Sequence, residues 1–169
     1  MINLFIRQPF TEAGDIQKNI TQEVLDGICA MQNNPYTLSF LNGTEAQNAS
    51  SFKDDFTKKT GIECTVRAFR KYRLQLLDKA DAFINIRTSL SESSTFELAY
   101  NIFKGKNAPV FFAVWNQSPI KTTLLQDLGD LCDIRYHNFD KASDLEEPIK
   151  EFLKYIHDDI TVPYNVNSG

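Results

Sequence analysis

The sequence predicts one α/β domain: a doubly wound, Rossmann-like sheet of five parallel strands with helices on both faces. Short apolar, β-prone runs alternate with amphipathic segments along the chain, which is the order of consecutive strand–helix units. The run from Pro109 to Trp115 is almost continuously apolar, as in a central parallel strand that is covered on both sides. The length of 169 residues favours a single domain over two.

The strands are expected at residues 2–6, 36–41, 82–86, 109–115 and 133–139. The helices are expected at residues 15–31, 65–79, 94–104 and 143–157, with a further helical segment near 122–131. Apolar residues recur at spacings of three and four in the first helix. Gly105 is a stop signal after the third helix, and Ser143 to Glu146 forms a capping box before the last.

The predicted domain spans residues 1–160 and is followed by a flexible tail at residues 161–169. Within the domain, residues 42–61 form a polar insertion that is longer than an ordinary connection between elements. We expect this insertion to be a mobile loop with about one helical turn. Long loops of this kind often cover or bind a ligand.

Composition excludes several classes of function. The net charge is −4, so no basic excess indicates a nucleic-acid polymer as the partner. No apolar run is long enough to cross a membrane and the N-terminus has no secretory pattern, so we expect a cytoplasmic protein with no membrane partner. Three widely spaced cysteines and two histidines show no disulfide or metal spacing, and we expect neither a metal site nor a cofactor.

Three segments that follow predicted strands are candidates for one site, because ligands bind beyond the carboxyl ends of the strands in such sheets. They are residues 7–10, 87–97 and 115–118. The candidate binding residues in the last segment are Trp115 and Asn116. Trp115 could stack on a base or pack in the core. Arg87 follows the third strand directly, and a role in the site and a surface ion pair are both open.

The middle segment carries the sharpest pattern, in which Ser91, Ser93 and Ser94 crowd the start of a helix that contains Glu97. Free backbone N–H groups and the helix dipole at such a position favour an anion, for example a phosphate. A carboxylate in the first turn could attack an electrophilic sugar carbon. However, Ser94 and Glu97 also have the spacing of a capping box, which is a purely structural role.

The stretch from Ser94 to Lys106, Ser-Thr-Phe-Glu-Leu-Ala-Tyr-Asn-Ile-Phe-Lys-Gly-Lys, resembles the hallmark helix of the nucleoside 2-deoxyribosyltransferase-like family. Residues 2–10 resemble the first strand and sugar-site loop of that family, residues 72–86 its approach to the third strand, and residues 144–153 its last helix. The similarity extends over about two thirds of the chain and leaves residues 46–65 unmatched.

This resemblance implies that Glu97 is a nucleophile that attacks the anomeric carbon of a nucleoside or nucleoside 5′-monophosphate. Ser91, Ser93 or Ser94 would hold a sugar hydroxyl or the 5′-phosphate, and Gln8 and Phe10 would lie beside the sugar. No cofactor is implied. A homodimer or higher homo-oligomer is implied, because relatives often complete their sites across a subunit contact.

The chain also departs from the family pattern. Arg73 lies near the position where the family has an aspartate that manages the proton of the leaving base, and a second family acid falls at Ser91. In the family, either water or another base takes the sugar, so the resemblance implies cleavage or transfer at the N-glycosidic bond. These differences count against base exchange and leave hydrolysis and binding without turnover open, with the base and the type of pentose undetermined. Because the resemblance points its position at the pocket, Arg73 is itself a candidate for binding a phosphate or a base. Two other functions stay open: a nucleotide-binding sensor without turnover on the same fold, and an NAD-cleaving domain similar to TIR domains.

Overall fold

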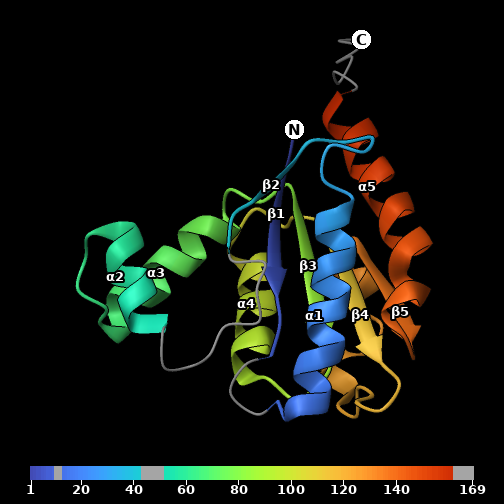
Figure 1. Ribbon diagram of the computed structural model, residues 1–169, viewed down its shortest axis with the longest axis horizontal. Coiled ribbons are helices and arrows are strands. Elements are labelled where there is room, and N and C mark those ends of the chain that lie inside the picture. The colour runs from blue at the N-terminus through green and yellow to red at the C-terminus, as the bar shows by residue number, and fades with distance from the viewer. Residues whose placement is uncertain (10–12, 43–51, 162–169) are drawn as a thin grey trace.

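The computed structural model describes residues 1–9, 13–42 and 52–161 and has a five-stranded parallel sheet at its centre (Figure 1). The strand order is β2-β1-β3-β4-β5, and every neighbouring pair is parallel. The strands are β1 (Ile2–Arg7), β2 (Leu38–Phe40), β3 (Ala82–Arg87), β4 (Val110–Trp115) and β5 (Ile134–Phe139). The fold class predicted from the sequence is therefore confirmed.

Helices cover both faces of the sheet. Helices α1 (Asp15–Ala30) and α5 (Glu146–Thr161) pack on one face, and α3 (Val66–Leu77) and α4 (Glu92–Phe103) lie on the other. Each layer has its own apolar core, because successive side chains of a strand point to opposite faces. In β4, Phe111 and Trp115 belong to the core beneath α1 and α5, whereas Phe112 belongs to the core beneath α4.

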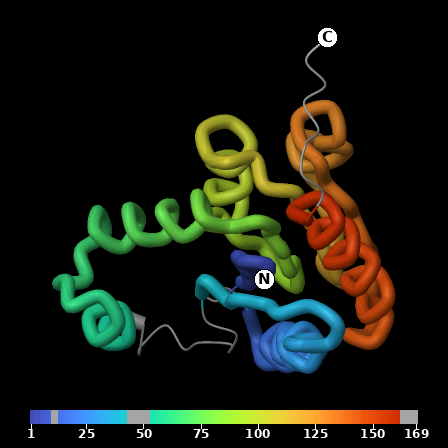
Figure 2. Tube along the Cα trace, turned by 90° about the horizontal axis from the view of Figure 1, so that it is seen from above, coloured from blue at the N-terminus to red at the C-terminus, as the bar shows by residue number. Residues whose placement is uncertain are grey.

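The polar insertion contains more structure than the sequence predicted. Its described part forms helix α2 (Phe52–Thr60), which is nine residues long rather than about one turn. Helices α2 and α3 extend together from one side of the sheet (Figure 2). Phe56 holds them together: its side chain is 5% exposed and makes edge-to-face contacts with the rings of Phe69 and Tyr72. A single buried aromatic in a polar segment is a weak sequence signal, which explains the wrong prediction.

Two smaller predictions are also corrected. The segment near residues 122–131 forms two short 3₁₀ turns, η1 (Thr123–Leu125) and η2 (Leu128–Asp130), instead of a helix. The last helix begins at Glu146, after the 3₁₀ turn η3 (Ala142–Leu145), so Ser143 does not cap it. Instead, the carboxylate of Asp144 accepts hydrogen bonds from the backbone N–H groups of Asp140 and Lys141.

The connections reverse direction at β1, because β2 lies on one side of it and β3 on the other. Open α/β sheets have their crevice at such a switch point, outside the carboxyl ends of the strands. Arg7 ends β1 at this edge, and the segment after Arg87 leads from β3 into α4. Among the described residues, no helix is long and apolar enough to cross a membrane.

Candidate active site

Helix α4 begins three residues earlier than its predicted capping box requires. Ser91 is the N-cap, and its side chain accepts a hydrogen bond from the backbone N–H of Ser94 at 3.3 Å. The hydroxyl of Ser94 donates instead to Oδ1 of Asn85 on β3, at 2.8 Å. Glu97 is consequently the sixth residue of the helix and lies in its second turn. The prediction that it caps the helix is wrong, and the helix dipole acts on it weakly because that effect is confined to the first turn.

Two arginines hold Glu97 in place. Nε of Arg73 lies 3.0 Å from Oε1 of Glu97, and Nη2 of Arg73 lies 3.3 Å from Oε2. Nε of Arg7 lies 3.3 Å from the same Oε2. The three side chains come from α3, α4 and the end of β1, and all are largely buried, with 8% to 13% of each side chain exposed. We refer to Arg7, Glu97 and Arg73 as the buried ion triad.

The strand pattern explains why Arg7 reaches Glu97. Phe5 and Arg7 are two residues apart on β1, so their side chains point to the face that carries α3 and α4. Nη2 of Arg7 donates to the hydroxyl of Ser91, which joins the strand to the start of the helix. Burial lowers the pKa of the Arg7 guanidinium; the charge of Arg73 lowers it further, whereas that of Glu97 raises it. The guanidinium of Arg73 lies over the ring of Phe5, 4.5 Å from its centre.

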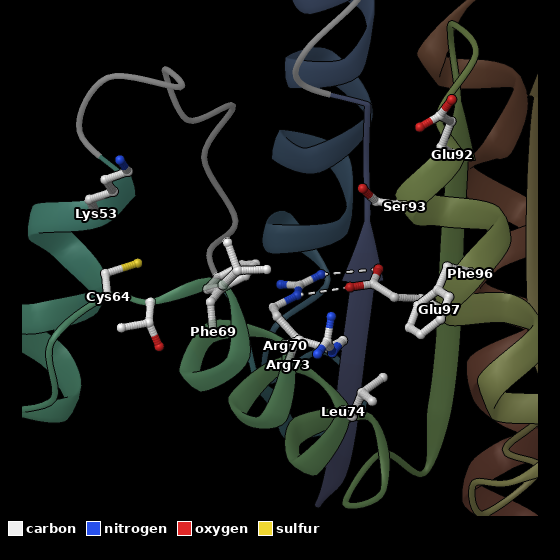
Figure 3. A pocket seen from close by; sticks show the side chains of 12 residues that line it. Lys53, Cys64, Phe69, Arg70, Arg73, Leu74, Glu92, Ser93, Phe96 and Glu97 are labelled. Carbon is white, nitrogen blue, oxygen red and sulfur yellow. Dashed lines mark hydrogen bonds and ion pairs between the residues drawn. The ribbon is translucent and has the colours of Figure 1, made fainter.

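A cavity of about 740 Å³ lies between α3 and α4, and Arg73 and Glu97 of the triad form part of its wall (Figure 3). In Figure 3, Arg73 and Glu97 point toward each other from the two helices, in front of β1. Its volume is within the range of sites for small molecules. The lining residues are Lys53, Cys64, Thr65, Val66, Phe69, Arg70, Arg73, Leu74, Glu92, Ser93, Phe96 and Glu97.

The wall of this cavity combines apolar side chains with cationic ones. Phe69, Leu74 and Phe96 offer apolar surface on which a planar ring could pack. Lys53 and Arg70 add positive charge near the triad. Within the described parts of the chain, no group of three or more metal-ligating side chains could hold a metal ion. The arrangement suits an organic ligand that has both a flat apolar part and an anionic part.

No protein-family model matches the chain, and no curated protein is significantly similar to it in sequence. Solved structures do match. The CMP N-glycosidase BcmB of Clostridium botulinum superimposes with a TM-score of 0.58 at 10% identity, over 89% of this chain and 98% of that one. The solution structure of BlsM gives a TM-score of 0.61 at 12% identity, over 97% and 96%.

The fold is nucleoside 2-deoxyribosyltransferase-like. A 2-deoxyribosyltransferase from Bacillus psychrosaccharolyticus also matches, with a TM-score of 0.46 at 16% identity over 85% of this chain and 90% of that one, which is too weak a superposition to support an argument. The resemblance of residues 94–106 had indicated the same fold, and this expectation is confirmed.

Within this nucleoside 2-deoxyribosyltransferase-like fold, only some of the site residues that the sequence predicted line the cavity. Glu97, Arg73 and Ser93 line it. Ser91 lies behind Glu97, with its hydroxyl in contact with Arg7, and Ser94 is engaged with β3.

The remaining predicted residues lie elsewhere. Arg87 donates to the backbone carbonyls of Ser118 and Pro119, which ties the loop after β4 to β3. Gln8 is buried and Asn116 is exposed, and neither lines the described cavity. Trp115 is 5% exposed in the core beneath α1 and α5, on the sheet face opposite Glu97, which matches the core-packing alternative. Phe10 lies outside the described residues.

Sequence reasoning did not single out Arg7 or Lys53 as site residues, although Arg7 begins the candidate segment at residues 7–10. A signal existed for Arg7, which is a charged residue at the end of a largely apolar strand. It lies two positions after Phe5, so both side chains must point to the same face of the sheet and toward the helices that cover it. Lys53 gave no such signal, and for Arg70 both a binding role and a solvated helix face were open. Lysines and arginines on amphipathic helices are usually solvated, and only the packing of α2 on α3 brings Lys53 to the cavity.

Proposed function

We propose that the protein hydrolyses the N-glycosidic bond of a nucleoside or nucleoside 5′-monophosphate, with Glu97 as the nucleophile. One observation supports this above all: Glu97 is a 6% exposed carboxylate in the wall of a ligand-sized cavity, and it is paired with Arg7 at the carboxyl end of β1. A buried carboxylate held in a cavity is a candidate for covalent chemistry. The shared fold with a CMP N-glycosidase is consistent with this chemistry.

The proposed reaction has two steps. An oxygen of Glu97 forms a bond to the anomeric carbon while the bond from that carbon to the base nitrogen breaks, and the base leaves with the bonding electron pair and takes a proton from water. Water then attacks the anomeric carbon of the glycosyl ester, which restores the carboxylate and releases the sugar and a proton. The net change is addition of one water across the N-glycosidic bond.

The triad supports this chemistry by holding the nucleophile. Two hydrogen bonds from Arg73 and an ion pair with Arg7 hold the carboxylate in one orientation in the free protein. Phe69 and Phe96 provide apolar surface for the base. With arginine at position 73, that side chain offers no carboxyl group to exchange protons with a base, which favours hydrolysis over base exchange.

A second function, nucleotide binding without turnover, is favoured by the same triad. Both oxygens of Glu97 are engaged by guanidinium groups, which compete with the sugar carbon for the carboxylate lone pairs. In a sensor, these contacts would persist when the ligand binds. In a hydrolase, at least one of them must lengthen during the reaction.

The test is release of free base from a panel of nucleosides, nucleoside 5′-monophosphates and NAD, followed by chromatography. The wild-type protein should release base from at least one nucleoside or monophosphate, and Glu97→Gln should lower the rate by a factor of about 10³ or more, as when covalent catalysis is lost. Glu92→Gln is the matched comparison, because Glu92 is an exposed carboxylate in the same cavity, and its loss should stay within about tenfold.

Each outcome has a defined meaning. Normal turnover by a folded Glu97→Gln variant would refute the proposed nucleophile. Calorimetric binding of a monophosphate without base release would favour the sensor. Base release from NAD alone would favour the TIR-like alternative.

A further inference from the structure

In the structure, the carboxylate of Glu97 is paired with two arginines. Arg73 binds both of its oxygens at 3.0 and 3.3 Å, and Arg7 shares the second. A carboxylate with two guanidinium partners has little free electron density to offer to carbon, because these donors stabilise its charge. If Glu97 acts as a nucleophile, one partner must therefore release it when the substrate is bound.

The two arginines differ in their freedom to move. Arg7 is anchored on both sides, since its backbone is in β1 and its guanidinium also donates to the cap of α4 at Ser91. Arg73 lies on α3 and lines the cavity itself, and its side chain is 13% exposed against 8% for Arg7. Its guanidinium lies over the flat ring of Phe5, a contact that involves no directional hydrogen bond. Arg73 is therefore the partner that a ligand can displace.

The charges around the cavity indicate what would displace it. Among the described lining residues, Lys53, Arg70 and Arg73 are cationic, whereas Glu92 and Glu97 are anionic. Arg7 adds a further cation behind Glu97, in a protein whose net charge is −4. A local excess of positive charge in an acidic protein favours an anionic ligand.

The serines at the start of α4 are less available to such an anion than their sequence indicates. The hydroxyl of Ser91 is engaged by Arg7 and by the backbone of Ser94, and the hydroxyl of Ser94 donates to Asn85. Of the three predicted serines, only Ser93 lines the cavity. Arg73, which lines the cavity, is thus better placed for an oxyanion than Ser91 or Ser94, and its guanidinium has the planar donor geometry that phosphate prefers.

We propose that Arg73 is a specificity-determining residue that exchanges its partner: it pairs with Glu97 in the free protein and with the 5′-phosphate of the substrate in the complex. This inference rests on the proposed function, because the exchange of partners by Arg73 is the event that frees Glu97 for attack. A nucleoside without the phosphate leaves Arg73 on Glu97 and is turned over poorly. The protein therefore acts on nucleoside 5′-monophosphates and discriminates against the corresponding nucleosides.

The first experiment compares kcat/KM for a nucleoside 5′-monophosphate, for the same nucleoside alone, and for that nucleoside with inorganic phosphate added. The wild-type preference for the monophosphate should be about 100-fold, and free phosphate should raise nucleoside turnover several-fold by drawing Arg73 away. Arg73→Gln should lower the preference at least about tenfold, by slowing the monophosphate and speeding the nucleoside. Arg73→Lys should keep part of the preference. Arg67→Gln, an exposed arginine of α3 outside this cavity, is the control and should change nothing.

A purely structural role for Arg73 predicts a different pattern, in which both substrates slow by the same factor and inorganic phosphate has no effect. That pattern would overturn the inference while leaving Glu97 as the nucleophile. Conversely, undiminished base release by Glu97→Gln would overturn the proposed function itself. The two failures are thus distinguishable in one set of assays.

A second experiment needs no turnover. Glu97→Gln removes the charge that competes for Arg73, so the variant should bind the nucleoside 5′-monophosphate about tenfold more tightly than the wild type in calorimetry. Its affinity for the nucleoside should change little, and Glu97→Gln combined with Arg73→Gln should lose the gain. Unchanged or weaker monophosphate binding by a folded Glu97→Gln variant would contradict partner exchange. Thermal melts of every variant verify that it is folded.

Discussion

Replacement of Arg7 by methionine tests whether the buried ion triad holds the structure as well as the nucleophile. Methionine keeps the length of the apolar stem but removes the contacts to Glu97 at 3.3 Å and to Ser91 at 3.1 Å. Loss of one partner of a buried ion pair costs about 3 to 5 kcal/mol when the other is left alone. Here Arg73 still pairs with Glu97, and the burial that lowers the pKa of Arg7 is a cost the variant no longer carries. We therefore expect a loss of about 2 kcal/mol.

For a chain of this length, that loss corresponds to a fall in Tm of about 4 to 8 °C, measured by thermal melting with circular dichroism. Glu97→Gln should destabilise more than Arg7→Met, because it leaves two guanidinium groups facing each other without a counter-charge. Arg67→Met on the exposed side of α3 should change the free energy of unfolding by less than about 0.5 kcal/mol. A Tm for Arg7→Met within about 1 °C of the wild type, or the reverse order of the first two variants, would refute the reasoning.

Four other predictions concern separate parts of the molecule. Burial alone would raise the pKa of Asp81, but hydrogen bonds from Lys106 and Asn3 outweigh that effect and lower it. The stabilisation from Asp81 is therefore complete above its unfolded pKa of 3.8 and is lost as the pH falls through its folded pKa. Thermal melts across an acid pH series should show this loss of Tm in the wild type, and Asp81→Asn should lack it. Phe56→Ala should release α2, which limited proteolysis would detect within residues 52–60, while the Tm of the sheet changes little. Trp115→Phe should lower the Tm but leave KM within about twofold; a larger rise in KM would revive its predicted stacking role. Light scattering at assay concentrations should show a homo-oligomer, and a monomer would count against the assembly that the family resemblance implies.

The sequence was sufficient for the sheet because each strand is determined locally. Five β-prone runs can be found without knowing their neighbours, and Pro109 to Trp115 is recognisable as the central one because both of its faces are apolar. The predictions failed where structure depends on a distant partner. Helix α2 is held by contacts of Phe56 with α3, and its own polar sequence gives little indication of it.

The same distinction between local and distant determinants applies to the candidate site. Glu97 could be identified from its own segment, because the resemblance of residues 94–106 extends over one continuous helix. Its partners could not, because Arg7 and Arg73 are 90 and 24 positions away in the chain. The parallel pairing of β1 with β3 brings Arg7 to Glu97, and the packing of α3 against α4 brings Arg73. The sequence by itself therefore determined the fold class and singled out the candidate carboxylate, whose catalytic role stays a prediction. The tertiary structure decided what surrounds that carboxylate, because the charge environment of a buried group is set by side chains that are close in space and remote in sequence.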